Sequence, residues 1–233
     1  MNTDPVLQLR DIRFDYEQGQ RLIDIGHFTI NKGESIFLRG PSGSGKSTLL
    51  GLIGGVLTPD AGSVSIGGID ISDITAGRRD QIRADHLGII FQQFNLLPYL
   101  SVIQNCILPC RFSATRKQKA IDMSGSVNAA AQNLVKALGL SEEHLARPVR
   151  ELSVGQQQRV AVARALIGGP DLIIADEPTS ALDHDNRDRF IELLNSQREV
   201  FGSSLLFVSH DSTLASHFDR AESLTDLNQR VAA

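Results

Sequence analysis

The sequence has few cysteines, no long apolar run and no excess of positive charge, and each absence argues against a class of protein. Its two cysteines, Cys106 and Cys110, lie four residues apart with no histidine beside them, which excludes a disulfide framework and argues against a metal site. No apolar run approaches the roughly 20 residues that a membrane-spanning helix needs. The formal net charge is -4, which argues against a nucleic-acid partner because such proteins usually carry a basic surface.

The N-terminal residues, MNTDPVLQLRD, contain no basic stretch followed by an apolar one, so they do not predict a signal peptide. We interpret the two thiols as buried or inert groups in a reducing compartment. Together these features predict a cytoplasmic protein. If it works at a membrane, another protein must hold it there.

Apolar strand patterns alternate with helix patterns in the first and last thirds of the chain. A half-buried strand is predicted at 6–14, where apolar and polar residues alternate. Further strands are predicted at 27–30, 35–40, 63–68, 87–93, 170–178 and 203–211, and helices at 45–56 and 183–200. Such alternation predicts an α/β fold with parallel strands at its core.

The chain contains no internal repeat and no low-complexity linker, so we expect one domain over residues 1–233. Its start has the pattern of a separate antiparallel β unit. Residues 113–140 are mostly helical in character, and a helical unit at about 95–168 is predicted to be inserted between strands of the core.

The segment GPSGSGKS has the pattern of a phosphate-binding loop between a predicted strand and a predicted helix. Glycines let backbone N–H groups turn toward phosphates, and the helix N-terminus adds partial positive charge. Lys46 is expected to reach the β- and γ-phosphates of a nucleotide, and Ser47 to hold Mg²⁺. The alternative, a glycine-rich turn that binds nothing, does not account for this lysine and serine. The candidate residues are Gly40, Pro41, Ser42, Gly43, Ser44, Gly45, Lys46, Ser47 and Thr48.

Two acids, Asp176 and Glu177, end the apolar strand LIIAD. Ligands of open α/β sheets bind beyond such strand ends, so Asp176 is expected to hold Mg²⁺ and Glu177 to orient an attacking water as a base. His210 ends the next apolar strand and is expected at the same edge, near a γ-phosphate. Gln92 follows the strand LGIIF; a contact to the Mg²⁺ shell or to water and a plain polar loop are equally good interpretations.

A second segment with features of a phosphate-binding site, ELSVGQQQRVAVARAL, combines a hydroxyl group, a glycine and the start of a predicted helix. Ser153 can cap the helix, and Gln156 completes a capping box. An N-terminus open to an anion also binds phosphate, and the two interpretations are compatible.

These motifs, in this order, resemble the nucleotide-binding subunit of an ABC transporter. The matching segments are GPSGSGKST, FQQFNLLPYLSV, LSVGQQQRVAVARAL, LIIADEPTSALD and VSHD. The resemblance implies ATP and Mg²⁺ as cofactors and an ATP-dependent head-to-tail homodimer that drives an integral membrane permease. The protein would then lie on the inner face of the cell membrane. It implies that Tyr16 stacks on adenine, and that Ser153, Gly155, Gln156 and Asp183 act on the partner's nucleotide, with Gln92 as a further Mg²⁺ ligand.

Two longer segments, residues 41–72 and 87–105, are similar to the branch of this family that serves lipoprotein release, macrolide efflux and cell division. Three features differ from that branch: Val154 replaces the usual glycine, TSALD replaces TGNLD, and the segment SATRKQKAIDMSGSVNAAAQ is longer. We expect Val154 to be tolerated if its φ is negative, and Gly155 to be indispensable.

Two other functions compete with a transporter subunit. A soluble ABC-type ATPase of DNA repair would carry a long coiled coil before the second motif, and one of translation would carry two such domains; this chain has room for neither. A non-hydrolysing ATP-dependent clamp is the third hypothesis, against which the intact Glu177 and His210 argue.

Overall fold

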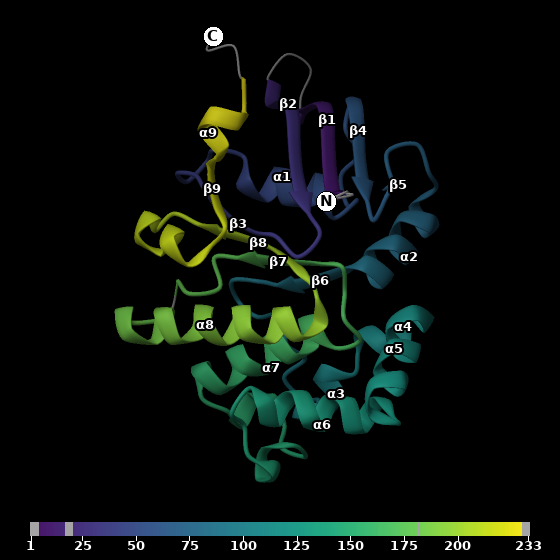
Figure 1. Cartoon of the computed structure of the whole chain (residues 1–233), viewed down its shortest axis with the longest axis vertical. Helices are drawn as coiled ribbons and strands as arrows, with labels where there is room; N and C mark the ends of the chain where they lie inside the picture. The colour runs from purple at the N-terminus through teal and green to yellow at the C-terminus, as the bar shows by residue number, and fades with distance from the viewer. Residues whose placement is uncertain (1–4, 17–20, 181, 230–233) are drawn as a thin grey trace.

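The strands of the computed structural model form two separate sheets, one antiparallel and one parallel (Figure 1). The structure describes residues 5–16, 21–180 and 182–229. The antiparallel sheet has the order β2-β1-β4-β5 and the parallel sheet the order β6-β7-β8-β3-β9. The antiparallel strands are β1 (Pro5–Asp15), β2 (Arg21–Asn31), β4 (Ala61–Ile66) and β5 (Ile69–Asp70). The parallel strands are β3 (Ser35–Arg39), β6 (Leu87–Ile90), β7 (Leu172–Asp176), β8 (Ser204–Ser209) and β9 (Arg220–Ser223). The predicted α/β fold with a parallel core and an antiparallel unit is confirmed.

The helices connect successive strands or follow the last strand. Helix α1 (Lys46–Ile53) follows β3, α2 (Ala76–His86) precedes β6, and α8 (His184–Phe201) connects β7 to β8. Between β6 and β7 lie α3 (Val102–Cys106), α4 (Pro109–Phe112), α5 (Ala114–Ser124), α6 (Val127–Ala137) and α7 (Val154–Leu166), and α9 (Leu224–Leu227) follows β9. Among the described residues, no helix has both the length and the apolar character needed to cross a membrane.

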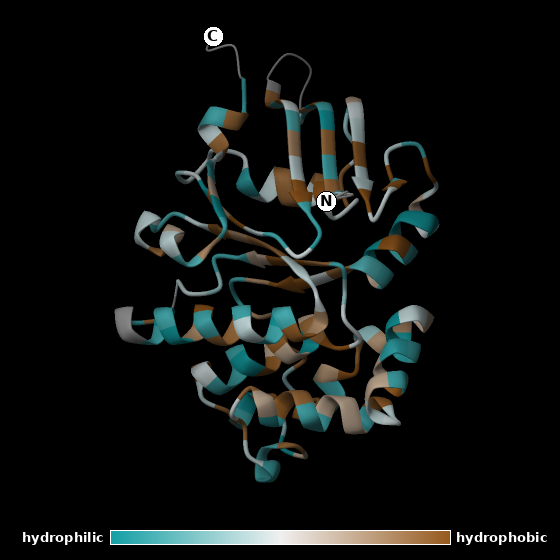
Figure 2. Ribbon diagram, viewed as in Figure 1, coloured by the Kyte–Doolittle hydropathy of each residue, from teal (hydrophilic) through white to brown (hydrophobic). Residues whose placement is uncertain are grey.

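The parallel sheet separates two apolar cores. Along β8, Leu205 and Phe207 face the core formed with α3, α6, α7 and α8, whereas Leu206 and Val208 face the core formed with α1 and the antiparallel sheet. A sheet covered on both faces reads as a nearly continuous apolar run, and Figure 2 shows these strands as predominantly hydrophobic. The strand patterns of the sequence follow from this double burial.

The helices between β6 and β7 are attached to the parallel sheet through the buried side chain of Arg116 on α5. Its guanidinium donates to the carbonyls of Leu87, Ala165 and Ile167 at 3.1, 2.6 and 2.8 Å. A cation beside the last carbonyls of α7 is favourable because the C-terminus of a helix carries partial negative charge. Burial lowers the pKa of Arg116 to about 10.

Two glycines allow these backbones to approach closely. A Cβ at Gly88 of β6 would lie 2.3 Å from the carbonyl oxygen of Ala165, and one at Gly168 would lie 2.3 Å from that of Arg116. Neither position therefore accepts a side chain without a shift of the backbone.

Some elements of the fold were not predicted from the sequence, whereas the state of both cysteines was. Helix α2 and strand β9 were not predicted, because α2 buries only Ile82 and β9 is short and polar. Cys106 and Cys110 are free and buried, as expected. Burial raises the pKa of Cys106 to about 12, which keeps this thiol protonated and unreactive.

Candidate active site

The candidate site lies at the carboxyl edge of the parallel sheet. Strands β6, β7, β8 and β3 are parallel neighbours, so their carboxyl ends meet at one edge. Beyond these ends come Gln92, the pair Asp176–Glu177, His210 and the loop that starts at Gly40. The topology therefore brings the motif residues of four separate segments to the same edge.

The loop of residues 40–45 has the backbone of an anion cradle. Gly43 and Gly45 adopt φ values of 77° and 100°, which side chains with a Cβ rarely adopt. Lys46 folds back over the loop, and its Nζ donates to the carbonyl oxygens of Gly40 at 2.6 Å and Pro41 at 3.1 Å. The ammonium is thus held above the loop that opens α1.

The N-terminus of α1 differs from those of the other long helices. Among helices of eight or more residues in the described ranges, α1 alone has no side chain that caps its first N–H groups. The capping residues of the others are Thr75, Ser113, Ser126, Ser153 and Asp183. Because free N–H groups at a helix start attract anions, the start of α1 presents uncapped donors at this edge.

Two residues hold the side chain of Glu177: Ser209, which ends β8, and His210, which follows it. Its carboxylate lies 3.0 Å from His210 Nδ1 and accepts a hydrogen bond from the buried Ser209 hydroxyl at 3.2 Å. Its Oε1 is 3.9 Å from Lys46 Nζ. Glu177 also has a φ of 46°, an unusual value for a residue other than glycine. This backbone conformation and three side-chain neighbours determine where the carboxylate lies.

Asp176, one residue earlier, has a different environment. Burial raises its pKa, the negative charge of Glu177 raises it further, and the positive charge of Lys46 opposes both effects. A cation bound beside Asp176 would favour its charged form. Gln92, by contrast, is exposed in the loop after β6.

The second motif forms the start of α7. Ser153 Oγ accepts from the backbone N–H of Gln156 at 3.3 Å, and Gln156 Oε1 accepts from the N–H of Ser153 at 2.9 Å, so the expected capping box is present. Val154 is 53% exposed and has no positive φ, which explains why a β-branched residue is tolerated. Gly155 has no positive φ, and a Cβ there would meet no atom within 4 Å. The fold of this chain therefore does not explain the glycine.

Two further candidates lie beside these motifs. Tyr16 is 64% exposed, its ring packs edge-on against Phe14, and its hydroxyl is 3.4 Å from Thr48 Oγ1 in α1. Tyr16 is thus next to the phosphate loop. Asp183 caps α8 by accepting from the backbone N–H of Asn186 at 3.0 Å.

The structure adds residues that sequence reasoning missed. Arg164 on α7 donates to the carbonyls of Phe94 and Asn95 at 2.5 and 2.6 Å, and so fixes the loop that contains Gln92. Gln158 on α7 donates to the carbonyl of Pro178, directly after Glu177, at 2.8 Å. The signal for Arg164 was a lone charge in the apolar run VAVARALI; Gln158 had no signal in its polar run.

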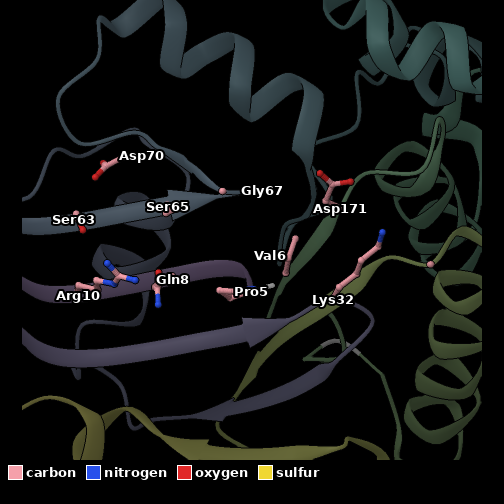
Figure 3. Close-up of a pocket in the computed structure, with 12 residues that line it drawn as sticks. Pro5, Val6, Gln8, Arg10, Lys32, Ser63, Ser65, Gly67, Asp70 and Asp171 are labelled. Carbon is pink, nitrogen blue, oxygen red and sulfur yellow. The ribbon is translucent and has the colours of Figure 1, made fainter. Parts of the chain in front are cut away.

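A separate groove of about 570 Å³ lies on the outer face of the antiparallel sheet (Figure 3). The outward side chains of β1 and β4 form its floor, with Gln8 and Arg10 beside Ser63 and Ser65, and Lys32 and Asp171 lie at its far end. None of the predicted site residues lines it. The motif residues therefore do not belong to this groove.

Comparisons with known proteins agree with this geometry. The ABC transporter family model matches residues 23–180. The lipoprotein-releasing system ATP-binding protein LolD of Novosphingobium aromaticivorans is 40% identical over 221 residues, which cover 94% of this chain and 95% of LolD. The macrolide export ATP-binding/permease protein MacB 2 of Aeromonas hydrophila subsp. hydrophila is 37% identical over 227 residues, 96% of this chain but 34% of MacB 2. The solved dimer of the ATP-binding cassette MJ0796, in a post-hydrolysis state with ADP and phosphate, has a TM-score of 0.79 and 34% identity and covers 96% of this chain and 97% of its own.

Proposed function

Because the chain belongs to the ABC transporter family, we propose that it is the ATP-binding subunit of such a transporter and hydrolyses ATP in a head-to-tail dimer to drive a separate membrane partner. The family membership confirms the resemblance predicted from the motifs. LolD and MacB 2 support a transporter of the lipoprotein-release or macrolide-export branch. The single observation that carries the proposal is the uncapped start of α1 at the sheet edge where Lys46, Glu177 and His210 converge.

The loop of residues 40–48 would bind the phosphates of ATP. Its backbone N–H groups supply neutral hydrogen-bond donors, and the start of α1 supplies partial positive charge. Lys46 supplies a full positive charge. Tyr16 is exposed beside the loop and offers a ring on which adenine would stack.

The donor set at the sheet edge fits Mg²⁺. Ser47 supplies a hydroxyl, Gln92 an amide oxygen and Asp176 a carboxylate, and Mg²⁺ prefers a few oxygen ligands from protein together with phosphates and water. No group of three or more His, Cys, Asp or Glu side chains within the described ranges would hold a metal by itself. When bound, Mg²⁺ would neutralise part of the negative charge of the phosphates. Ser47, Gln92 and Asp176 would hold and orient it.

Glu177 would accept the proton of the attacking water. It is hydrogen-bonded by Ser209 and contacts His210, which restricts the directions from which its remaining lone pairs can receive a water. His210 would contact the γ-phosphate from the end of the neighbouring strand β8. Phosphoryl transfer depends mainly on such positioning.

The start of α7 would complete the site of a second chain. Ser153 and Val154 are exposed, and Gly155 has open space where a Cβ would stand. A glycine that the fold does not need is explained by a close approach from outside, such as the γ-phosphate held by a partner. Gln156 and Asp183 would lie at the same interface.

The membrane partner would dock in a groove of about 580 Å³ between α2 and α4. Phe91 and Phe112, which line it, are 37% and 71% exposed, so an apolar face remains uncovered. We assign to it an amphipathic segment of the membrane partner. Phe91, which lines the groove, directly precedes Gln92. Gln92 would therefore connect binding of the membrane partner to the nucleotide.

The proposal is tested by phosphate release from ATP with Mg²⁺, with Lys46→Ala as the inactive control. Co-purification with an integral membrane protein, from detergent extracts of cells that produce this chain, tests the partner. We expect Phe112→Ala to retain basal hydrolysis and to lose co-purification. A chain that binds ATP without turnover would instead indicate a clamp, and equal recovery of the partner with Phe112→Ala would refute the groove.

A further inference from the structure

We infer that Arg187 is a positioning residue that joins the partner-facing segment before α8 to Glu177, and this inference rests on the proposed function. Arg187 lies in the first turn of α8. Its Nε donates to the carbonyl oxygen of Leu182 at 2.9 Å, and its Nη1 donates to Asp211 Oδ2 at 2.7 Å. One rigid guanidinium therefore fixes two loops that are far apart in the sequence.

The contact with Asp211 continues to Glu177 through hydrogen bonds. The backbone N–H of Asp211 donates to Ser209 Oγ at 3.2 Å, and the same hydroxyl donates to Glu177 Oε2 at 3.2 Å. Ser209 is 2% exposed, so its hydroxyl has these two partners in a largely dry environment. The chain of contacts thus extends from Leu182 to the carboxylate of Glu177.

The pair formed by Arg187 and Asp211 is built for a fixed geometry. The two side chains are 28% and 23% exposed. Asp211 Oδ1 accepts from the backbone N–H and the hydroxyl of Thr213 at 3.1 and 2.7 Å, which leaves Oδ2 for Arg187. These hydrogen bonds and the positive charge of Arg187 lower the pKa of Asp211, which keeps it ionised.

The consequence is a connection between the two sites of the proposed dimer. Leu182 precedes Asp183, which would face the partner's nucleotide, whereas Ser209 and His210 contact this chain's own Glu177. A shift of the 182–183 segment on dimer closure would move Arg187 and, through Asp211, the groups that orient Glu177. Arg187 would thereby transmit a movement of the partner-facing segment to the groups that orient Glu177.

The test compares steady-state hydrolysis by wild type, Arg187→Gln and Arg187→Lys, together with ATP binding by the separated chains. We expect Arg187→Gln to lower kcat about tenfold while KM for ATP changes less than about twofold, a loss within the usual range of couplings between sites. Arg187→Lys should retain an intermediate kcat, because an ammonium can pair with Asp211 but does not reproduce the two-pronged contact. The exposed Arg78 of α2 provides the matched control Arg78→Gln, which should match wild type.

Adding Asp211→Asn to Arg187→Gln should lower kcat no further, since both changes break the same chain of contacts. A kcat of Arg187→Gln within about twofold of wild type would overturn the inference, as would a parallel loss of ATP affinity, which indicates a general structural defect. If Arg187→Gln does not fold, Arg187→Lys and Asp211→Asn provide the same comparison. A wild-type chain without any ATP turnover would instead refute the proposed function.

Discussion

Lys46 Nζ lies 3.9 Å from Glu177 Oε1, and both side chains are largely buried. Lys46 opens α1 and Glu177 follows β7, so this pair connects the loop after β3 with the acids at the end of β7, across the intervening strand β8. The separation exceeds a hydrogen bond, and Glu177 is instead hydrogen-bonded by Ser209. The positive charge that phosphates require and the base that a water requires are therefore close without neutralising each other in a tight ion pair.

Replacing Glu177 with glutamine should separate ATP binding from turnover. The amide keeps the size of the side chain but does not accept a proton, so we expect hydrolysis to fall at least about 100-fold. The ATP-bound dimer should accumulate and elute early in size-exclusion chromatography with ATP, whereas Lys46→Ala should remain monomeric. Turnover of Glu177→Gln at the wild-type rate would remove Glu177 from the role of base.

Replacing Gly155 with alanine should separate stability from activity. A Cβ at Gly155 meets no atom within 4 Å, and alanine favours helices by up to about 1 kcal/mol over glycine. We expect the melting temperature to stay the same or rise, and ATP hydrolysis to fall at least about tenfold because the methyl group obstructs the partner's phosphate. Normal hydrolysis by a folded Gly155→Ala chain would contradict the proposed role.

Arg116→Met should destabilise the fold. The methionine fills much of the volume but leaves the carbonyls of Leu87, Ala165 and Ile167 without their donor. We expect a loss of about 3 kcal/mol in the free energy of unfolding, measured with urea. Lys117→Met, at the exposed neighbouring position of α5, is the control and should change it by less than about 0.5 kcal/mol. Equal effects of the two variants would show that the buried guanidinium is not an anchor.

Asp171, directly before β7, should make the stability of the fold decrease in acid. The hydrogen bond with His86 lowers the pKa of Asp171 below its ordinary value of 3.8, with smaller contributions from the charges of His86, Lys119 and Lys32. Because the carboxylate is favoured in the folded state, its stabilisation is present above 3.8 and is lost as the pH falls below that value.

Urea unfolding at several pH values tests this expectation. Wild type should lose more unfolding free energy between about pH 5 and pH 3 than Asp171→Asn does, whereas the exposed control Asp122→Asn should behave as wild type. Parallel pH curves for wild type and Asp171→Asn would contradict the assignment.

The sequence predicted the strands that carry the motifs because their apolar runs are short, continuous and followed at once by polar residues. Gln92, Asp176 and His210 each follow such a run, and parallel pairing brings the strand ends to one edge. Helix α2 was missed because most of its residues are polar or charged, with Ile82 as its one buried side chain.

The contacts of arginine side chains were also outside the reach of sequence patterns. Arg116, Arg164 and Arg187 donate to carbonyl groups or to a carboxylate 5 to 70 residues away in the chain. Such partners depend on the tertiary fold, and the residue type alone does not distinguish a buried arginine from a solvated one. The placement of the motif residues at one sheet edge was therefore predictable, whereas the network that positions them was not.

The central claim is that each chain holds only half of each active site, and the rate of ATP hydrolysis as a function of chain concentration tests it most directly. In the proposed assembly the start of α7 reaches the nucleotide only in a dimer, so the rate should rise more than linearly with concentration until dimers predominate. Specific activity should then become constant. A rate strictly proportional to chain concentration across the dimerisation range would mean that a single chain hydrolyses ATP alone, which would contradict the account.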